Sequence, residues 1–258
     1  MTATPPPDPA GAEQGFLGHL LELRARLLKA AVAVLLVLLA LLPFAEKLYA
    51  WLARPLIERL PRGSHMIAIE VASPFLTPVK LAFVTAIFLA MPVVLYQIWA
   101  FVSPGLYRHE KRLALPLLVS AVLLFYVGCA FAYFLVLPAA FHFLTLITPA
   151  GVSMMTDIGK YLDFVLTMFF AFGMCFEVPV AVVLLVALGV VSPDKLRRAR
   201  RYVIVGAFVV AAVLSPPDVM SQILLAVPMI LLYEIGVFAA AALVRDRDAR
   251  RSAAARGD

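Results

Sequence analysis

Residues 161–191 read YLDFVLTMFFAFGMCFEVPVAVVLLVALGVV, a long stretch in which nearly every side chain is apolar. A transmembrane helix needs about 20 such residues, so this stretch is long enough to cross a bilayer. The whole chain has the same character: 258 residues, 64% of them hydrophobic and 15% charged, with a mean hydropathy of +0.98. Soluble domains average about 45–50% apolar and about 25% charged residues. The composition therefore predicts an integral membrane protein and excludes a soluble globular domain.

Five more apolar runs lie on either side of this stretch. The predicted fold class is all-α: a polytopic membrane protein with one domain over residues 16–244. Its six transmembrane helices are expected near residues 27–44, 75–102, 113–138, 161–191, 202–217 and 219–244. Residues 46–74 mix charges with prolines and predict an extramembrane loop that contains short amphipathic helical pieces.

The last two spans are expected to be short. Residues 202–217 and 219–233 carry no charge, and the turn Ser215-Pro216-Pro217-Asp218 separates them. Each uncharged arm would reach only about 23 Å, against a hydrocarbon core of about 30 Å. We expect either a thinner bilayer around this hairpin or a tip that lies below the far surface.

Basic residues are distributed unevenly among the loops. Sixteen of the 22 Lys and Arg residues fall in residues 1–29, 102–113, 191–202 and 245–258. The positive-inside rule places these four regions, and hence both termini, in the cytoplasm. Such a distribution is typical of membrane topology and argues against a nucleic-acid-binding surface.

The two ends of the chain are expected to be tails. The Pro-rich residues 1–15 predict a disordered cytoplasmic tail without a cleavable signal peptide, and residues 245–258 predict a basic cytoplasmic tail. Cys129 and Cys175 both lie inside apolar runs, so neither a structural disulfide nor a metal site is expected. No cofactor is expected.

Glu177 is a carboxylic acid deep inside the fourth predicted span. An ionised carboxylate there costs several kcal/mol unless it meets water or a partner (on the order of 3 kcal/mol on insertion scales). Two interpretations are open: a protonated side chain hydrogen-bonded to a neighbouring helix, or a polar group in a water-filled cavity that meets a substrate. Pro179 removes a backbone donor two residues later and is expected to kink the helix.

Two further acidic residues lie where the chain meets the cytoplasmic surface. Glu22 precedes the first span and Glu110 lies in the loop between the second and third. Either could form an ordinary interfacial salt bridge, for example Glu22 with Arg26 four residues later. The four histidines show no metal-ligand spacing, and no nucleophile motif or phosphate-binding loop is present, so an enzyme is not expected.

Several ordered motifs resemble one family, TatC, the receptor subunit of the twin-arginine protein translocase. They are HLLELR at 19–24, ASPF at 72–75, YQIWAF at 96–101, PGLYRHE at 104–110, FG at 172–173, FEVP at 176–179 and SPPDVMSQ at 215–222. The resemblance implies a cup-shaped bundle in the bacterial cytoplasmic membrane that binds the signal peptides of folded export substrates and organises the translocation complex.

The resemblance also assigns roles to single residues. Glu22 and Glu110 would bind the paired arginines of the signal peptide, with Arg24, Phe101 and Tyr107 around them. Glu177 would be the polar residue of the concave face. The remaining positions are Pro55 and Phe75 in a periplasmic cap, and Ser215, Asp218 and Gln222 on the hairpin where the single-span partners TatA and TatB dock. Self-association is also expected.

Carboxylates at a lipid–water boundary suit the binding of paired arginines, because a guanidinium can bind a carboxylate through two parallel hydrogen bonds and a lysine cannot.

Two alternatives to a receptor are a small secondary transporter in which Glu177 carries a proton and a scaffold without a ligand. A transporter predicts internal repeats, and the two halves show no convincing repeat. A scaffold leaves Glu177 without a role.

Overall fold

The computed structural model describes residues 9–57, 67–102, 111–147, 157–214 and 219–256. Nearly all of them are helical, as predicted. The helices are α1 (Pro9–Leu41), α2 (Ala45–Ile57), α3 (Ser73–Val102), α4 (Lys111–Phe131), α5 (Leu137–Ile147), α6 (Ile158–Phe176), α7 (Val178–Ala187), α8 (Pro193–Leu214) and α9 (Val219–Arg256).

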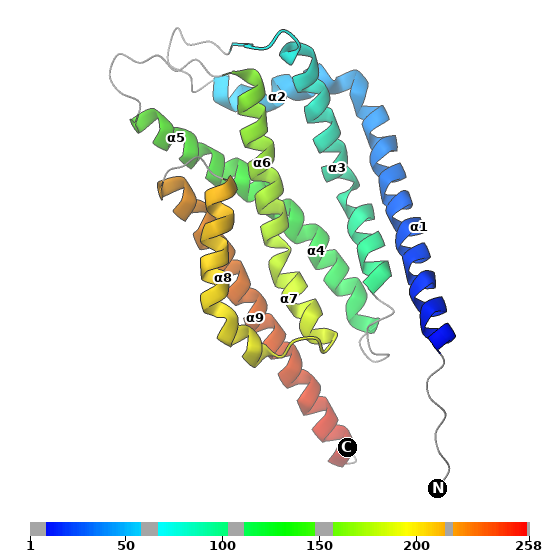
Figure 1. Cartoon of the computed structure of the whole chain (residues 1–258). Helices are drawn as coiled ribbons and strands as arrows, with labels where there is room; N and C mark the ends of the chain where they lie inside the picture. Colours follow the sequence, from blue (N-terminus) through cyan, green and yellow to red (C-terminus); the bar gives the residue numbers. More distant parts are fainter. Residues whose placement is uncertain (1–8, 58–66, 103–110, 148–156, 215–218, 257–258) are drawn as a thin grey trace.

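Five helical stretches in this part of the chain are long and apolar enough to cross a membrane: Leu20–Arg54, Ser73–Phe101, Leu115–Phe143, Ile158–Ala187 and Gln222–Ala249. The fifth predicted span, residues 202–217, corresponds to α8, whose charged first half leaves only a short apolar part. Figure 1 shows α1 beside α3 and α8 beside α9, with α6 and α7 between these two pairs. The start of α1 and the end of α9 lie at the same end of the bundle.

Helix α2 lies across the opposite end of the bundle (Figure 1) and matches the amphipathic piece predicted in residues 46–74. Leu52 and Ala53 are buried on one face, whereas Trp51 is exposed. The Trp51 ring stacks on Tyr133, with the centroids 6.2 Å apart and an interplanar angle of 4°. Tyr133 belongs to the π-helical segment Ala132–Val136 between α4 and α5. Pro138 follows this segment, and because it has no N–H it interrupts the regular hydrogen-bond ladder.

The stretch 161–191 contains two helices, and the break between them lies beside Pro179, where the sequence predicted a kink. Helix α6 ends at Phe176, Glu177 forms the turn, and α7 begins at Val178. The Glu177 N–H donates to the Met174 carbonyl at 3.1 Å, and the Ala181 N–H donates to the Glu177 carbonyl at 2.9 Å. The α-helix is therefore interrupted at its costly carboxylate.

Both ends of the chain are more helical than the sequence predicted. Helix α1 begins at Pro9, inside the segment expected to be a disordered tail. Helix α9 continues past Tyr233 and Arg245 to Arg256, so the last apolar arm is short but its helix is not. The alanine-rich, arginine-rich composition of residues 239–256 explains the extension, because both residue types favour helix. At 1.5 Å per residue the helix is about 57 Å long.

Asp157 connects two distant segments at the α2 end of the bundle. It caps α6 by accepting from the Lys160 N–H at 2.9 Å, and its other oxygen accepts from the Ile69 N–H at 3.0 Å. The Ile158 N–H donates to the Ile67 carbonyl at 2.9 Å. The pKa of Asp157 lies below its ordinary 3.8. The hydrogen bond from the Ile69 N–H is the main cause, and the hydrogen bond from the Lys160 N–H is the second. One ionised side chain therefore holds the segment before α3 against the start of α6.

This connection predicts an acid-sensitive contribution to stability. A carboxyl group whose pKa is lower in the folded protein than in the unfolded one stabilises the fold at pH values above the unfolded pKa. This contribution is lost as the pH falls through the folded pKa. We expect Asp157→Ala to have a lower apparent melting temperature than the parent at pH 7, and the difference to shrink below about pH 4. Thermal unfolding in detergent across pH 3–8 measures both. A difference that grows on acidification would contradict this role for Asp157.

Candidate functional site

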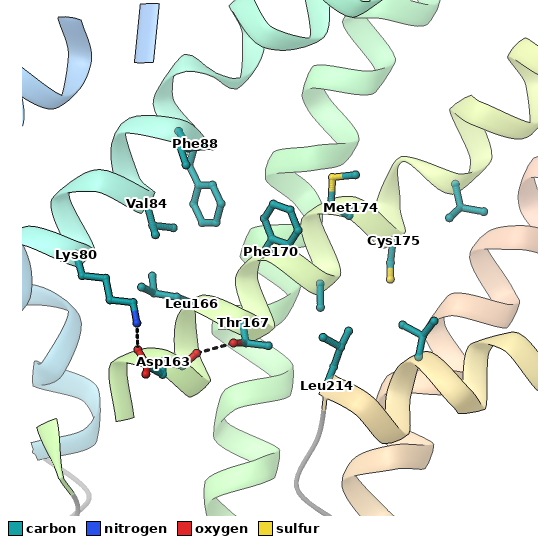
Figure 2. Close-up of a pocket in the computed structure, with 14 residues that line it drawn as sticks. Lys80, Val84, Phe88, Asp163, Leu166, Thr167, Phe170, Met174, Cys175 and Leu214 are labelled. Atoms are coloured by element: carbon teal, nitrogen blue, oxygen red, sulfur yellow. Dashed lines mark hydrogen bonds and ion pairs between the residues drawn. The ribbon is translucent and has the colours of Figure 1, made fainter. Parts of the chain in front are cut away.

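A cavity of about 630 Å³ lies between α3 and the broken helix α6–α7, with α8 closing one side. Figure 2 shows the side chains that point into it. Most of its lining is apolar: Val84, Ile87, Phe88, Leu166, Phe170, Ala171, Met174, Cys175, Val178, Val210 and Leu214. An occupant of this cavity would be apolar along most of its length.

One end of the cavity is polar. Lys80 Nζ on α3 lies 2.5 Å from Asp163 Oδ1 on α6, and both side chains are about half exposed, at 54% and 47%. The Thr167 hydroxyl donates to the Asp163 carbonyl at 2.7 Å. Figure 2 shows this polar group at the opposite end of the cavity from Cys175. This site was not predicted from the sequence, although ionisable residues inside predicted spans are a signal for one.

Glu177 lies at the break between α6 and α7, and its neighbours Met174, Cys175 and Val178 line the cavity while Glu177 itself does not. Among the described residues, no group donates a hydrogen bond to its buried Oε1. A buried carboxylate oxygen without a donor is costly. Neither a donor from a neighbouring helix nor a place in the lining of this cavity is seen for Glu177 among the described residues, and both sequence-based interpretations stay predictions.

Glu22 lies on α1 and forms the salt bridge that the sequence offered as its simpler explanation. Arg26 donates to Glu22 Oε1 from Nε at 2.9 Å and from Nη2 at 2.5 Å. Both bonds use one carboxylate oxygen, and the side chain of Glu22 is 37% exposed. The second oxygen can therefore accept from an additional donor. Arg24 is exposed on the same helix.

The other residues assigned to peptide binding are only partly within the described chain. Phe101 is half-buried near the end of α3, at the same end of the bundle as the start of α1 (Figure 1). Tyr107 and Glu110 lie outside the described residues.

Of the residues assigned to the cap and to the hairpin, the structure describes Pro55, Phe75 and Gln222. Pro55 is in α2, and Phe75, in the first turn of α3, is 74% exposed. Gln222 is half-buried, and its amide donates to the Phe208 carbonyl at 3.1 Å, which joins α9 to α8. Ser215 and Asp218 lie outside the described residues.

Helices α8 and α9 are also joined near the end where the termini lie. Arg200 Nη2 lies 2.6 Å from Glu234 Oε2, and the Tyr233 hydroxyl donates to the Leu196 carbonyl at 2.8 Å. The sequence analysis did not identify this pair either. Within the described ranges, no group of three or more His, Cys, Asp or Glu residues could hold a metal ion. Cys129 and Cys175 are free thiols.

Comparisons with known proteins agree with one another. The family model described as Sec-independent protein translocase protein (TatC) matches residues 18–228. The chain is 60% identical over 238 residues to the Sec-independent protein translocase protein TatC of Azotobacter chroococcum mcd 1, covering 92% of each chain. It is 57% identical over 225 residues to that of Escherichia coli strain K12, covering 87% of each. A crystal structure titled twin arginine translocase receptor TatC superposes with a TM-score of 0.78 at 38% identity, covering 87% of this chain and 98% of that one.

Proposed function

The chain belongs to the TatC family, and from this we propose that Glu22 and Glu110 bind the paired arginines of a signal peptide. The protein is the receptor subunit of a Sec-independent, twin-arginine protein translocase, a multi-pass membrane protein and not an enzyme. This membership decides against the transporter and scaffold alternatives.

The geometry of Glu22 supports this proposal best. Its carboxylate is partly exposed at the mouth of the bundle, and Arg26 occupies only one of its two oxygens. Arg26 orients the carboxylate, and an incoming guanidinium adds a hydrogen bond to the other oxygen. Glu110 would hold the second guanidinium, and Arg24, Phe101 and Tyr107 would border the site. Charge-assisted bonds of this kind contribute roughly 1.5–3 kcal/mol each.

The proposed location is the bacterial cytoplasmic membrane, with both termini in the cytoplasm. The supporting observations are the excess of Lys and Arg in four regions and the common end of the bundle at which α1 begins and α9 ends (Figure 1). The α2 end, with Pro55 and Phe75, then faces the periplasm and forms the cap.

The proposed partners are single-span subunits of the TatA and TatB type, together with further copies of this chain. Gln222, with Ser215 and Asp218 in the adjoining turn, would supply hydrogen bonds to a partner helix in lipid. The amide of Gln222 uses one N–H on Phe208, which leaves a second for a partner.

Binding of matched peptides tests the proposed function. We expect the protein in native membranes to bind an Arg-Arg signal peptide at least about tenfold more tightly than its Lys-Lys form, because the planar guanidinium can donate two N–H groups to one carboxylate oxygen, as Arg26 does to Glu22, and an ammonium has no such fork. Competition between the two peptides for a crosslinkable Arg-Arg probe measures the ratio. If the two peptides compete equally well, the site recognises positive charge alone and the proposal is overturned.

A further inference from the structure

We propose that the Lys80–Asp163 pair is a second peptide subsite, which binds the polar residues that follow the apolar core of an inserted signal peptide. This inference rests on the proposed function but concerns a different site. Lys80 lies on the second turn of α3 and Asp163 on the second turn of α6, so the pair is at the cap end of the bundle, far from Glu22. Neither residue lies in the motifs that carry the family resemblance.

The packing of α3 and α6 does not need this ion pair. The adjacent side chains Leu81 and Leu162 are buried in the main core, at 3% and 0% exposure. Lys80 and Asp163 instead extend into the cavity (Figure 2). A half-exposed ion pair contributes only about 0–1 kcal/mol to stability, so packing gives no reason for two charges here. A ligand gives one.

The length of the cavity matches that of the apolar core of a signal peptide, of which the cavity would hold one face. Asp163 and Cys175 are twelve positions apart on one helix, which separates them by about 18 Å. A helical occupant of that length has about 12 residues, and the apolar core of a signal peptide has roughly 7–15. With that core against the apolar wall, the polar residues after it reach Lys80 and Asp163.

The pair carries one positive and one negative charge, which suits it to the polar segment after the apolar core of the peptide. Where the peptide leaves its helix, its backbone N–H and C=O groups lose their internal partners, and in lipid each unpaired group costs several kcal/mol (about 2–7). Lys80 can donate to carbonyls and Asp163 can accept from amides without regard to side-chain sequence. The single-span helix of a partner subunit satisfies its own backbone and has no comparable need for the pair.

Crosslinking tests the subsite. A photoreactive residue is placed directly after the apolar core of an Arg-Arg signal peptide, and a second probe is placed beside the arginines. Both are applied to membranes containing the full translocase. The variant Lys80→Met/Asp163→Leu removes both charges together, so no lone charge stays in the membrane. We expect its crosslinks from the first probe to α3 and α6 to fall about tenfold, and those from the second probe to be unchanged.

Two further variants make the result specific. The exchange Lys80→Asp/Asp163→Lys keeps both charges and is expected to retain most of the crosslinking. The matched control Arg200→Met/Glu234→Leu removes another interhelical pair, at 2.6 Å, whose residues do not line the cavity, and it should behave like the parent.

The subsite is overturned if the apolar double variant crosslinks like the parent, or if crosslinking from both probes falls together. It is also overturned if a probe in a partner helix, and not one in the peptide, reacts at Lys80. Failure of the proposed function gives a different result: the unmodified protein would not distinguish Arg-Arg from Lys-Lys peptides.

Discussion

Replacing Gly128 with leucine is expected to prevent α4 from packing on α6 and to remove most of the folded protein from the membrane. Gly128 is buried, and a Cβ atom there would lie 2.5 Å from the Phe172 carbonyl oxygen and 3.0 Å from the Phe176 Cβ. The obstacle is backbone, which cannot rotate away as a side chain can. Overpacking a core costs about 1–3 kcal/mol, and we expect the upper end of that range or more. The apparent melting temperature in detergent should fall by on the order of 10 °C.

Gly206 on α8 provides the matched control for Gly128. An added Cβ there meets no atom within 4 Å, so Gly206→Leu should accumulate and melt like the parent. Quantifying the membrane-integrated protein together with its melting temperature separates a packing defect from poor expression. If the Gly128 and Gly206 variants are equally stable, α4 does not approach α6 as closely as described.

Replacing Glu110 with lysine is expected to abolish recognition of the Arg-Arg signal peptide. The change removes a carboxylate and adds a charge of the same sign as the guanidinium, so attraction becomes repulsion. Glu110→Gln, which removes only the charge, should weaken binding about tenfold or more. Glu22→Gln should have a similar effect. Peptide affinity is measured on membranes with the competition assay described above.

Glu177→Gln is the control for these changes, because it neutralises a carboxylate deeper in the bundle and keeps its shape. It should leave peptide binding nearly intact and alter only deep insertion or transport. Parent-like binding by both Glu22→Gln and Glu110→Gln, or loss of recognition with Glu177→Gln alone, would reverse this division of roles.

The presence of several apolar helices, and one break in them, could be predicted from local chemistry. The apolar runs predicted the spans, and Pro179 predicted the break between α6 and α7, because a missing N–H acts on its own helix whatever surrounds it. The helical extension of α9 was not predicted, although it also follows from local sequence. The arginines after Arg245 were interpreted as a tail, whereas their helix propensity continues the helix to Arg256.

The amino-acid sequence by itself determined that this protein crosses the membrane several times, where its main helix breaks, and through its motifs which family it belongs to. Only the tertiary structure decided which side chains meet. Lys80 and Asp163 are 83 positions apart, and Gly128 meets Phe172 across two helices. The physical reason is that in a bilayer both the lipid-facing and the core-facing sides of a helix are apolar. The rotation of each helix about its axis therefore leaves little trace in the sequence pattern, and it is set by packing against its neighbours.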